Sequence, residues 1–482
     1  MIDEIIAWLN ESLGWVLIVT LLTAGVLFTV LTRGVQFRHF GTMWRTIFSS
    51  RGNAGQGVSS FQAFAISLAS RVGTGNIVGV AVALTLGGPG AIFWMWVMAL
   101  FGMATAFIEA TLAQLYKIRH GEDHTFRGGP AYYIQAGMGV RWLGIVFAVA
   151  LIFTFGFAFN MVQANTIAGV VQGTWGIEPL WTAIVLTLLA GVIIFGGIKS
   201  VARVAEFLAP GMALVYVLLA VAVLVVRAGD IPEAVGQIFA GAFGLDQALA
   251  GTAGGILAAL LNGVRRGMFS NEAGMGSAPN AAATANASHP VQQGLIQSAG
   301  VFVDTIIICT ATALMILLSA PDVYTPGVTQ RDVSATLTQT ALASELGTWV
   351  APVMAVLIFV FAFSSVLGNY TYAEVNQDFI GGGRVANYAT RALAVGAVFW
   401  GALQELGTVW SLADVAMSVM AVINLTALAF LGVRAVEALK DFDAQKGLPP
   451  MERTLVIEPG SKLDKAVPGD MWREASPTRV TS

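Results

Sequence analysis

One stretch of this sequence places small and polar residues where an apolar helix would otherwise continue. Residues 70–79 read SRVGTGNIVG, between the apolar runs FQAFAISLA and VAVALTL. Gly73 and Gly75 each weaken a helix by roughly 1 kcal/mol, so a break is predicted here. A break frees backbone N–H groups, which suit an anion, and carbonyl oxygens, which suit a hard cation such as Na⁺.

Two other interpretations compete for this stretch. Gly75 and Gly79 have the GxxxG spacing of a helix-packing contact. The letters GTGNIVG also resemble a glycine-rich dinucleotide fingerprint, but that motif requires a preceding strand and a soluble βαβ unit. Because neither is indicated around residues 70–79, the dinucleotide interpretation is discounted and the packing interpretation stays open.

A second stretch, GVRRGMFSNEAGMGSAPNAAATANASHP at residues 263–290, interrupts another apolar run. Irregular backbone survives at membrane depth only where it lines a cavity or is buried in protein. The basic pair Arg265 and Arg266, together with His289, also allows an ordinary cytoplasmic loop for the later part. The start of the stretch, however, comes before the upstream helix is long enough to span the full thickness of the bilayer.

Polar side chains lie inside two further apolar runs. Ser364 and Ser365 are adjacent hydroxyls in FSSVLGNYTYAE, and they either complete a cation site with carbonyls of the first break or bond back to their own helix. Asn160 and Gln163 in FNMVQANTIAG share a helix face. They either line a pocket or make hydrogen bonds between helices.

Three single acids also lie in apolar runs, namely Glu109, Asp304 and Asp414. Each is a candidate partner for Arg71 or Arg266, or part of a proton path. For Arg71 the expected partner is Glu109, Glu272 or Asp304.

The composition indicates which elements must position these groups. Of 482 residues, 56% are hydrophobic and only 11% are charged, whereas ordinary soluble domains carry roughly 25% charged residues. The chain is therefore predicted to be an integral membrane protein. The net charge of −3 argues against a nucleic-acid partner, and the single Cys309 cannot form an intramolecular disulfide. No organic cofactor is expected.

An all-α transmembrane architecture of about 11 helices follows from the apolar runs. The runs lie near 14–32, 60–86, 91–115, 142–168, 179–196, 207–227, 248–275, 293–318, 349–372, 390–405 and 407–431. Alternate loops are basic, which places the N-terminus outside and the C-terminus in the cytoplasm of a bacterial-type plasma membrane.

Three connecting segments complete this prediction. Residues 36–50 mix aromatic and basic side chains and should lie along the cytoplasmic interface. Residues 319–348 form the longest external loop, long enough for an extracellular gate. The polar tail beyond about residue 434 is predicted to be a short amphipathic helix followed by disorder.

The interrupted runs occupy matching places in two halves of the chain. If the first span is peripheral, five helices precede residue 228 and five follow it, and the two sets enter the membrane from opposite sides. The predicted divisions are 1–57, 58–228, 229–432 and 433–482. Interrupted helices at matching positions of inverted halves point to a transporter's midplane site.

Long motifs in these halves resemble those of a known family. They are FQAF, VGTGNIVGVA, GGPGAIFWMWVMALFGMATAFIEATLAQLY, GGPAYYI, NGVRRGMFSNEAGMGSAPNAAA, HPVQQGLIQ and GVFVDT. The sequence is similar to the alanine or glycine:cation symporters (sodium:alanine symporters) of the amino acid-polyamine-organocation superfamily. The resemblance implies a leucine-transporter-type fold of five-plus-five inverted repeats, with one extra N-terminal helix.

The resemblance also implies roles for matching positions. Gly73, Thr74 and Gly75, with Asn76 beside them, would hold a substrate carboxylate. Carbonyls of Ala69 and Val72, with Ser364 and Ser365, would bind Na⁺. The remaining substrate-binding positions would be Phe269, Ser270, Asn271, Asn160 and Gln163.

The expected activity is import of a small neutral amino acid, alanine or glycine, with Na⁺ by alternating access. The alternative is a proton-coupled or exchange carrier for another small amino acid, with Glu109 or Asp414 carrying the proton. A membrane-embedded enzyme is a remote alternative, because the four histidines lie at predicted interfaces or loops. No enzymatic activity is expected, and the oligomeric state stays open.

Overall fold

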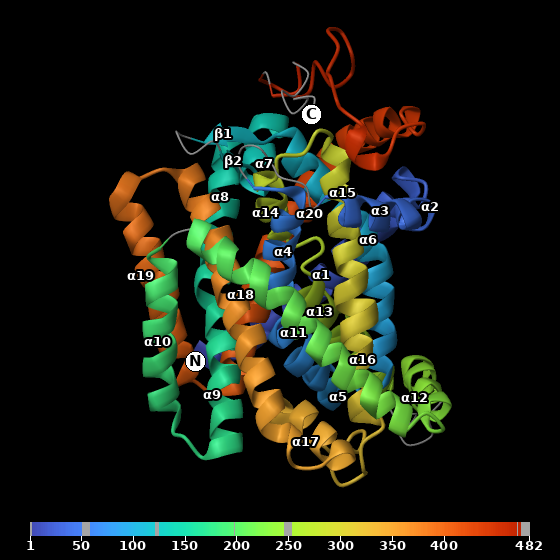
Figure 1. The fold of residues 1–482 in the computed structure, drawn as a ribbon, viewed down its shortest axis with the longest axis vertical. Helices are drawn as coiled ribbons and strands as arrows, with labels where there is room; N and C mark the ends of the chain where they lie inside the picture. The colour runs from blue at the N-terminus through green and yellow to red at the C-terminus, as the bar shows by residue number, and fades with distance from the viewer. Residues whose placement is uncertain are drawn as a thin grey trace.

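The computed structural model describes residues 2–50, 58–120, 125–196, 198–244, 253–469 and 471–473, and these are mostly helical (Figure 1). The predicted boundary at residue 57, the start of the run 248–275 and the end of the tail lie outside the described residues. Two short strands, β1 (Ile118–His120) and β2 (Thr125–Arg127), pair antiparallel with Ile118 opposite Arg127.

The helices follow in chain order. The first half contains α1 (Ile2–Leu31), α2 (Val35–Arg38), α3 (Phe40–Ser49), α4 (Ser60–Arg71), the π-helical η1 (Gly75–Gly79), α5 (Val80–Gly87), α6 (Gly90–Leu115), α7 (Pro130–Met138), α8 (Arg141–Leu151), the π-helical η2 (Ile152–Phe159), α9 (Asn160–Trp175), α10 (Pro179–Ile194), α11 (Ile198–Val226) and α12 (Ile231–Phe243). The second half contains α13 (Ala253–Asn271), α14 (Ala278–Thr284), α15 (Pro290–Val301), the π-helical η3 (Phe302–Cys309), α16 (Thr310–Leu317), the 3₁₀ turn η4 (Arg331–Val333), α17 (Ser334–Leu346), α18 (Val350–Ile380), α19 (Gly383–Ala402), α20 (Leu406–Ala444) and the 3₁₀ turn η5 (Pro450–Glu452).

Each predicted apolar run is largely helical where it is described, and the runs 60–86 and 248–275 contain the breaks described below. Among the described residues, six helices are long and apolar enough to cross a membrane, or up to eight if two bent pairs each count as one span. The helix α10 is shorter, and α13 and α19 are less apolar. Lipid-facing surfaces are recognisable because large apolar side chains are exposed, including Val192 at 79% and Phe430 at 70%.

Two broken helices run in opposite directions through the centre. In Figure 1, α4 lies above α5, whereas the later helix α14 lies above α13. The first pair is bent by 48° around residues 72–74. The second is interrupted after Asn271, where Glu272 adopts φ 57° and Gly274 and Gly276 adopt φ 87° and 85°. This arrangement confirms the inverted relation predicted for the interrupted runs.

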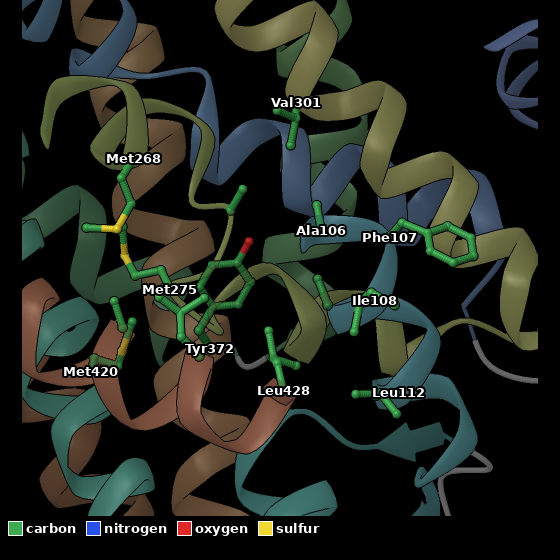
Figure 2. Close-up of a cluster of buried hydrophobic side chains, with 14 of the residues drawn as sticks. Ala106, Phe107, Ile108, Leu112, Met268, Met275, Val301, Tyr372, Met420 and Leu428 are labelled. Atoms are coloured by element: carbon green, nitrogen blue, oxygen red, sulfur yellow. The ribbon is translucent and has the colours of Figure 1, made fainter. Parts of the chain in front are cut away.

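A continuous apolar core packs around these breaks. Figure 2 shows buried side chains of this core, among them Ile108 on α6, Met268 on α13 and Met420 on α20. Tyr372 on α18 belongs to the same core and is fully buried. The core therefore ties both halves of the chain together beside the breaks.

The predicted interfacial and external segments are both folded. The helices α2 and α3 form at one end of the molecule, and Arg38 makes an ion pair with Asp443 at 2.8 Å (Figure 1). This end, which also holds the C-terminal segment, is called the tail end below. At the opposite end the segment 319–348 contains η4 and α17, and the Tyr324 hydroxyl donates to the Leu84 carbonyl of α5 at 3.0 Å.

The prediction of disorder in the tail was wrong for residues 445–469. The helix α20 continues to Ala444, and the chain then folds back over the tail end, burying Leu455 and Trp472. The Trp472 indole N–H donates to the Gln114 carbonyl at 3.2 Å, and the Tyr116 hydroxyl donates to the Ala466 carbonyl at 3.0 Å. Scattered large apolar residues supply enough burial to order an otherwise polar segment.

Candidate functional site

The first helix break exposes two backbone donors to side-chain oxygens. The helix α4 ends at Arg71, and Val72 has the non-helical angles φ −75° and ψ 89°. The Gly73 N–H donates to Asn76 Oδ1 at 3.0 Å, and the Thr74 N–H donates to Gln163 Oε1 at 3.4 Å. The buried Thr74 Oγ1 has no hydrogen-bond partner among the described residues. The structure thus brings Gln163 of α9 to the break.

The glycines of the break allow close contact with two other helices. A Cβ atom added at Gly73 would lie 2.1 Å from Ser365 Oγ on α18. One added at Gly75 would lie 3.0 Å from Ser270 Cα on α13, whereas one added at Gly79 would meet Trp410 at an ordinary 3.6 Å. Gly75 therefore packs closely against α13, whereas Gly79, the other glycine of the GxxxG spacing, makes no close contact.

The two serines of α18 reach the first break. Ser364 Oγ and Ser365 Oγ donate toward the Ala69 carbonyl at 3.3 and 3.2 Å. Each also donates toward the Phe361 carbonyl of its own helix, at 2.9 and 3.1 Å. The back-bonding to their own helix is therefore observed, and the same hydroxyls also reach a carbonyl of the first break. Val72 is buried next to Arg71 at the same helix end.

The second break joins the first through direct hydrogen bonds. Asn76 Nδ2 donates to Ser270 Oγ at 2.9 Å, and Ser270 Oγ donates to Asp304 Oδ2 at 2.7 Å. Asn271 Nδ2 donates to Thr305 Oγ1 at 3.2 Å. The predicted residues Ser270 and Asn271 therefore meet the π-helical segment η3, whose Asp304 was not assigned to the site from the sequence.

An aromatic stack and an ion pair lie next to the second break. The Phe269 ring is 4.5 Å from Phe159 and 4.6 Å from Trp410, measured between ring centroids. The Arg266 guanidinium lies 4.6 Å from the Trp410 centroid and pairs with Asp414. Asp414 is thereby shown to be the partner of Arg266.

A polar network that includes Ser70 of α4 contains Asn160. Asn369 Nδ2 donates to Asn160 Oδ1 at 3.0 Å, which is the bond between helices that the sequence allowed for Asn160. Ser70 Oγ lies 3.2 Å from Asn369 Oδ1 and 3.0 Å from Glu272 Oε1. The sequence analysis missed Asn369, although it lies four residues after Ser365 and so shares its helix face.

The partner predicted for Arg71 was wrong. The guanidinium donates to Gln297 of α15, from Nη1 to the backbone carbonyl at 3.2 Å and from Nη2 to Oε1 at 2.9 Å. Glu109 instead accepts from the Gly274 N–H at 3.1 Å and from Asn424 Nδ2 at 2.5 Å. A guanidinium carries five N–H donors, and the two oxygens of Gln297 accept from two of its nitrogens here.

Each of the three π-helical segments among the described residues adjoins this site. The segment η1 contains Asn76, η2 ends just before Asn160, and η3 contains Asp304. Wide helical turns of this kind recur at functional sites because they free backbone groups and turn side chains out of register. Residue types alone do not distinguish them from ordinary helix.

Comparison with known proteins agrees with this geometry. The profile of the sodium:alanine symporter family matches residues 1–453. The chain belongs to the sodium:alanine symporter family. Among its relatives, the "Amino-acid carrier protein AlsT" of Bacillus subtilis (strain 168) is 48% identical over 444 residues, which are 92% of each chain.

Two further relatives carry names that specify an ion and an amino acid. The "Sodium/alanine symporter AgcS" of Methanococcus maripaludis is 38% identical over 436 residues, covering 89% of this chain and 94% of the relative. The "Probable sodium/glutamine symporter GlnT" of Bacillus subtilis (strain 168) is 43% identical over 450 residues, covering 92% of both.

A solved structure shows the same fold. The crystal structure of MhsT in complex with L-phenylalanine superimposes with a TM-score of 0.57 at 16% identity, covering 79% of this chain and 90% of MhsT. This member of the sodium:alanine symporter family is thus a multi-pass amino acid symporter with the leucine-transporter-type fold. The helix α1 is its extra N-terminal helix.

Proposed function

We propose that this symporter imports a small neutral amino acid, alanine or glycine, together with Na⁺ by alternating access. The observation that carries the proposal is the meeting of two inverted helix breaks. One supplies the N–H groups of Gly73 and Thr74, and the other supplies Ser270 at hydrogen-bond distance from Asn76. Paired breaks of this kind provide ionic sites near a transporter's midplane.

The substrate carboxylate would bind to the Gly73 and Thr74 N–H groups. In this structure the side-chain oxygens of Asn76 and Gln163 accept from those groups, and a carboxylate is a stronger acceptor of the same geometry. Phe269, packed between Phe159 and Trp410, would limit the size of the substrate side chain. The relative AgcS is named a sodium/alanine symporter, which supports alanine as the substrate. The relative GlnT is named a probable sodium/glutamine symporter, so glutamine is the alternative substrate to test.

The Na⁺ site would be formed by the carbonyls of Ala69 and Val72 and the hydroxyls of Ser364 and Ser365. Neutral oxygen ligands of this kind suit a hard cation. One positive charge crossing 100 mV contributes about 2.3 kcal/mol, and a tenfold ion gradient adds about 1.4 kcal/mol. A single coupled Na⁺ therefore supports an accumulation ratio of roughly several hundred.

The orientation and the repeat boundaries belong to the same proposal. The tail end carries basic residues such as Arg38 and Lys117 and would face the cytoplasm, with the N-terminus outside. The first repeat would span residues 58–228 and the second 229–432. The segment around α17 would then lie at the extracellular entrance.

A proton-coupled or exchange carrier is the alternative mechanism. Of its two candidate proton carriers, Asp414 is engaged by Arg266, which favours its ionised form. Glu109 accepts hydrogen bonds from Gly274 and Asn424 through its two carboxyl oxygens and remains the candidate proton carrier of this alternative. The ion pair with Arg266 argues against Asp414 in that role.

Uptake of labelled alanine into proteoliposomes tests the proposal. We expect uptake with an inward Na⁺ gradient, competition by glycine, and little competition by glutamine. The paired changes Ser364→Ala and Ser365→Ala should sharply raise the Na⁺ concentration needed. Uptake driven by a pH gradient alone would refute Na⁺ coupling, and unchanged Na⁺ dependence in the double variant would refute this cation site.

A further inference from the structure

The folded C-terminal segment is bonded to one turn at the tail end of the molecule. Residues 445–469 and 471–473, here called the strap, leave α20 at the tail end and contact the turn between α14 and α15 (Figure 1). The Leu455 N–H donates to the Ser288 carbonyl at 3.0 Å, and the Ser288 hydroxyl donates to the Arg453 carbonyl at 2.9 Å. Gln292 Nε2 of α15 donates to the same Arg453 carbonyl at 3.2 Å. The strap therefore holds this turn through backbone groups of its own.

The far end of the strap reaches the end of α6. The Trp472 indole N–H donates to the Gln114 carbonyl at 3.2 Å, and the Tyr116 hydroxyl donates to a strap carbonyl at 3.0 Å. The Trp472 ring centroid also lies 5.1 Å from Lys117 Nζ, which donates to the Ala285 carbonyl at 2.9 Å. Lys117 is buried, and its Nζ atom thus connects the strap to the end of α14.

The same turn is joined to the start of α4. Val58 pairs with Ala285 as residues of neighbouring parallel strands do, and the Asn286 N–H donates to the Val58 carbonyl at 2.9 Å. Gln293 Nε2 of α15 donates to the carbonyl of Ser60, the first residue of α4, at 3.4 Å. The strap, the turn and the start of α4 therefore form one continuous chain of contacts.

Opening at the tail end would strain this chain of contacts. Alternating access requires movement of packed helices around a fixed binding site. The helix α4 is the tail-end half of the first broken helix, so opening at this end separates its start from neighbouring helices. With the strap docked, α4 moves only by breaking the pairing of Val58 with Ala285 or by pulling the turn away from the strap. The second movement breaks the bonds of the strap to Ser288 and Gln292.

We propose that the strap is an autoinhibitory latch that holds the tail end of the symporter closed. The inference rests on the proposed transport by alternating access, and in the proposed orientation the latch faces the cytoplasm. Within the residues that the structure describes, the strap contains one 3₁₀ turn, η5, and otherwise irregular backbone. A segment of this kind can detach locally without unfolding of the membrane helices. Its release frees the turn and α4 to move together.

Cysteine labelling of the full-length protein in detergent measures opening at the tail end. Ala63 lies in the first turn of α4 and is fully buried, so a cysteine there is protected while this end is closed. The native Cys309 is buried too, and the chain without Ala63→Cys gives the background rate. In Ala63→Cys, the added change Trp472→Ala should raise the rate of modification by a polar maleimide about tenfold, because this rate follows the population of the open form.

Uptake of labelled alanine into proteoliposomes gives an independent measurement. The maximal Na⁺-driven rate should rise about threefold in Trp472→Ala if opening limits turnover, as conformational steps do in many enzymes. A purely structural role of Trp472 would lower this rate instead. Lys462→Ala is the matched control on the strap, because the Lys462 side chain is 75% exposed. It should leave both the labelling rate and the uptake rate unchanged.

A second variant keeps the inference testable if Trp472→Ala does not fold. Tyr116→Phe removes only the hydroxyl that donates to the Ala466 carbonyl. Loss of one hydrogen bond should raise the labelling rate of Ala63→Cys by about threefold. Tyr324→Phe is the matched control, because it removes the same kind of bond, to the Leu84 carbonyl, at the opposite end of the molecule. It should not raise labelling at Ala63→Cys.

The outcomes separate this inference from the proposed function. Unchanged labelling of Ala63→Cys in both Trp472→Ala and Tyr116→Phe would overturn the latch while Na⁺-driven uptake stands. Slower uptake in Trp472→Ala without faster labelling would also overturn it, because the strap would then only stabilise the fold. Absence of any Na⁺-driven uptake by the wild type would refute the proposed function itself, whereas labelling in detergent would still test the latch.

Discussion

Replacing Gly73 by alanine is the most direct perturbation of the first helix break. A Cβ atom at this position would lie 2.1 Å from Ser365 Oγ and 3.2 Å from Ser365 Cβ. The first contact is far too short, so the Ser365 hydroxyl must move by about 1 Å, a displacement that is costly in a preorganised site. It then leaves the Ala69 carbonyl, which it now contacts at 3.2 Å.

The magnitude follows from the loss of one ligand to a cation. A polar contact to a charged group contributes about 1.5–3 kcal/mol. The Na⁺ concentration for half-maximal uptake should therefore rise by roughly 10- to 150-fold in Gly73→Ala. Ser365→Ala removes the same oxygen directly, so it should produce a similar rise. The variant that combines Gly73→Ala with Ser365→Ala should need about the same Na⁺ concentration as either single variant, because both changes act on one contact.

The assay is Na⁺-dependent uptake of labelled alanine into proteoliposomes that contain equal amounts of each variant. Gly79→Ala is the control, since its Cβ would meet Trp410 at an ordinary 3.6 Å on the same broken helix. It should retain wild-type Na⁺ dependence. Equal Na⁺ half-saturation in Gly73→Ala and Gly79→Ala would refute the assignment of Ser365 to the cation. Additive effects of Gly73→Ala and Ser365→Ala would show that they act at separate places.

Three further predictions concern the ion pair, a buried histidine and the tail. Asp414→Asn leaves the buried Arg266 charge uncompensated, so thermal unfolding in detergent should show that the free energy of unfolding falls by about 3–5 kcal/mol. Replacing both residues by apolar ones should restore much of this free energy. Unchanged stability in Asp414→Asn would contradict the pairing. Burial lowers the pKa of His289, whose Nδ1 accepts from the Val291 N–H at 3.2 Å. The unfolded chain therefore takes up a proton at His289 at higher pH than the folded chain does, and stability should fall as pH drops below about 6.5. His289→Asn keeps a hydrogen-bond acceptor at the start of α15, so it should remove much of this pH dependence in thermal scans from pH 5 to 8. Trp472→Ala should weaken the packing of the tail against the membrane helices by about 3–5 kcal/mol. Backbone amides of residues 455–467 should then exchange hydrogen faster, while the Na⁺ concentration for half-maximal uptake stays unchanged. Slow exchange in these residues would show that Trp472 does not hold the tail in place.

The membrane location and the two helix breaks could be predicted from the sequence because they depend on local energetics. Low charge and long apolar runs identified a membrane protein, because the cost of burying charge acts on each segment separately. Gly73 and Gly75 marked the first break, since glycine weakens a helix wherever it stands. The glycine-rich and polar stretch after Asn271 marked the second break in the same way. Ser364 and Ser365 were candidates because hydroxyls in an apolar run require a partner.

Only the tertiary structure decided which groups meet. Asn76 and Asp304 are 228 residues apart in the chain, and Arg71 and Gln297 are 226 apart. Such pairings depend on how whole helices pack. A guanidinium bonds to carboxylates and to carbonyl oxygens alike, so residue type did not select Gln297 for Arg71. The tail is held in place by the hydrogen bond from Trp472 to Gln114. The polar composition of the tail gives no sign of this contact. Sequence thus located the helix breaks, and packing placed the carboxylate of Asp304 between them.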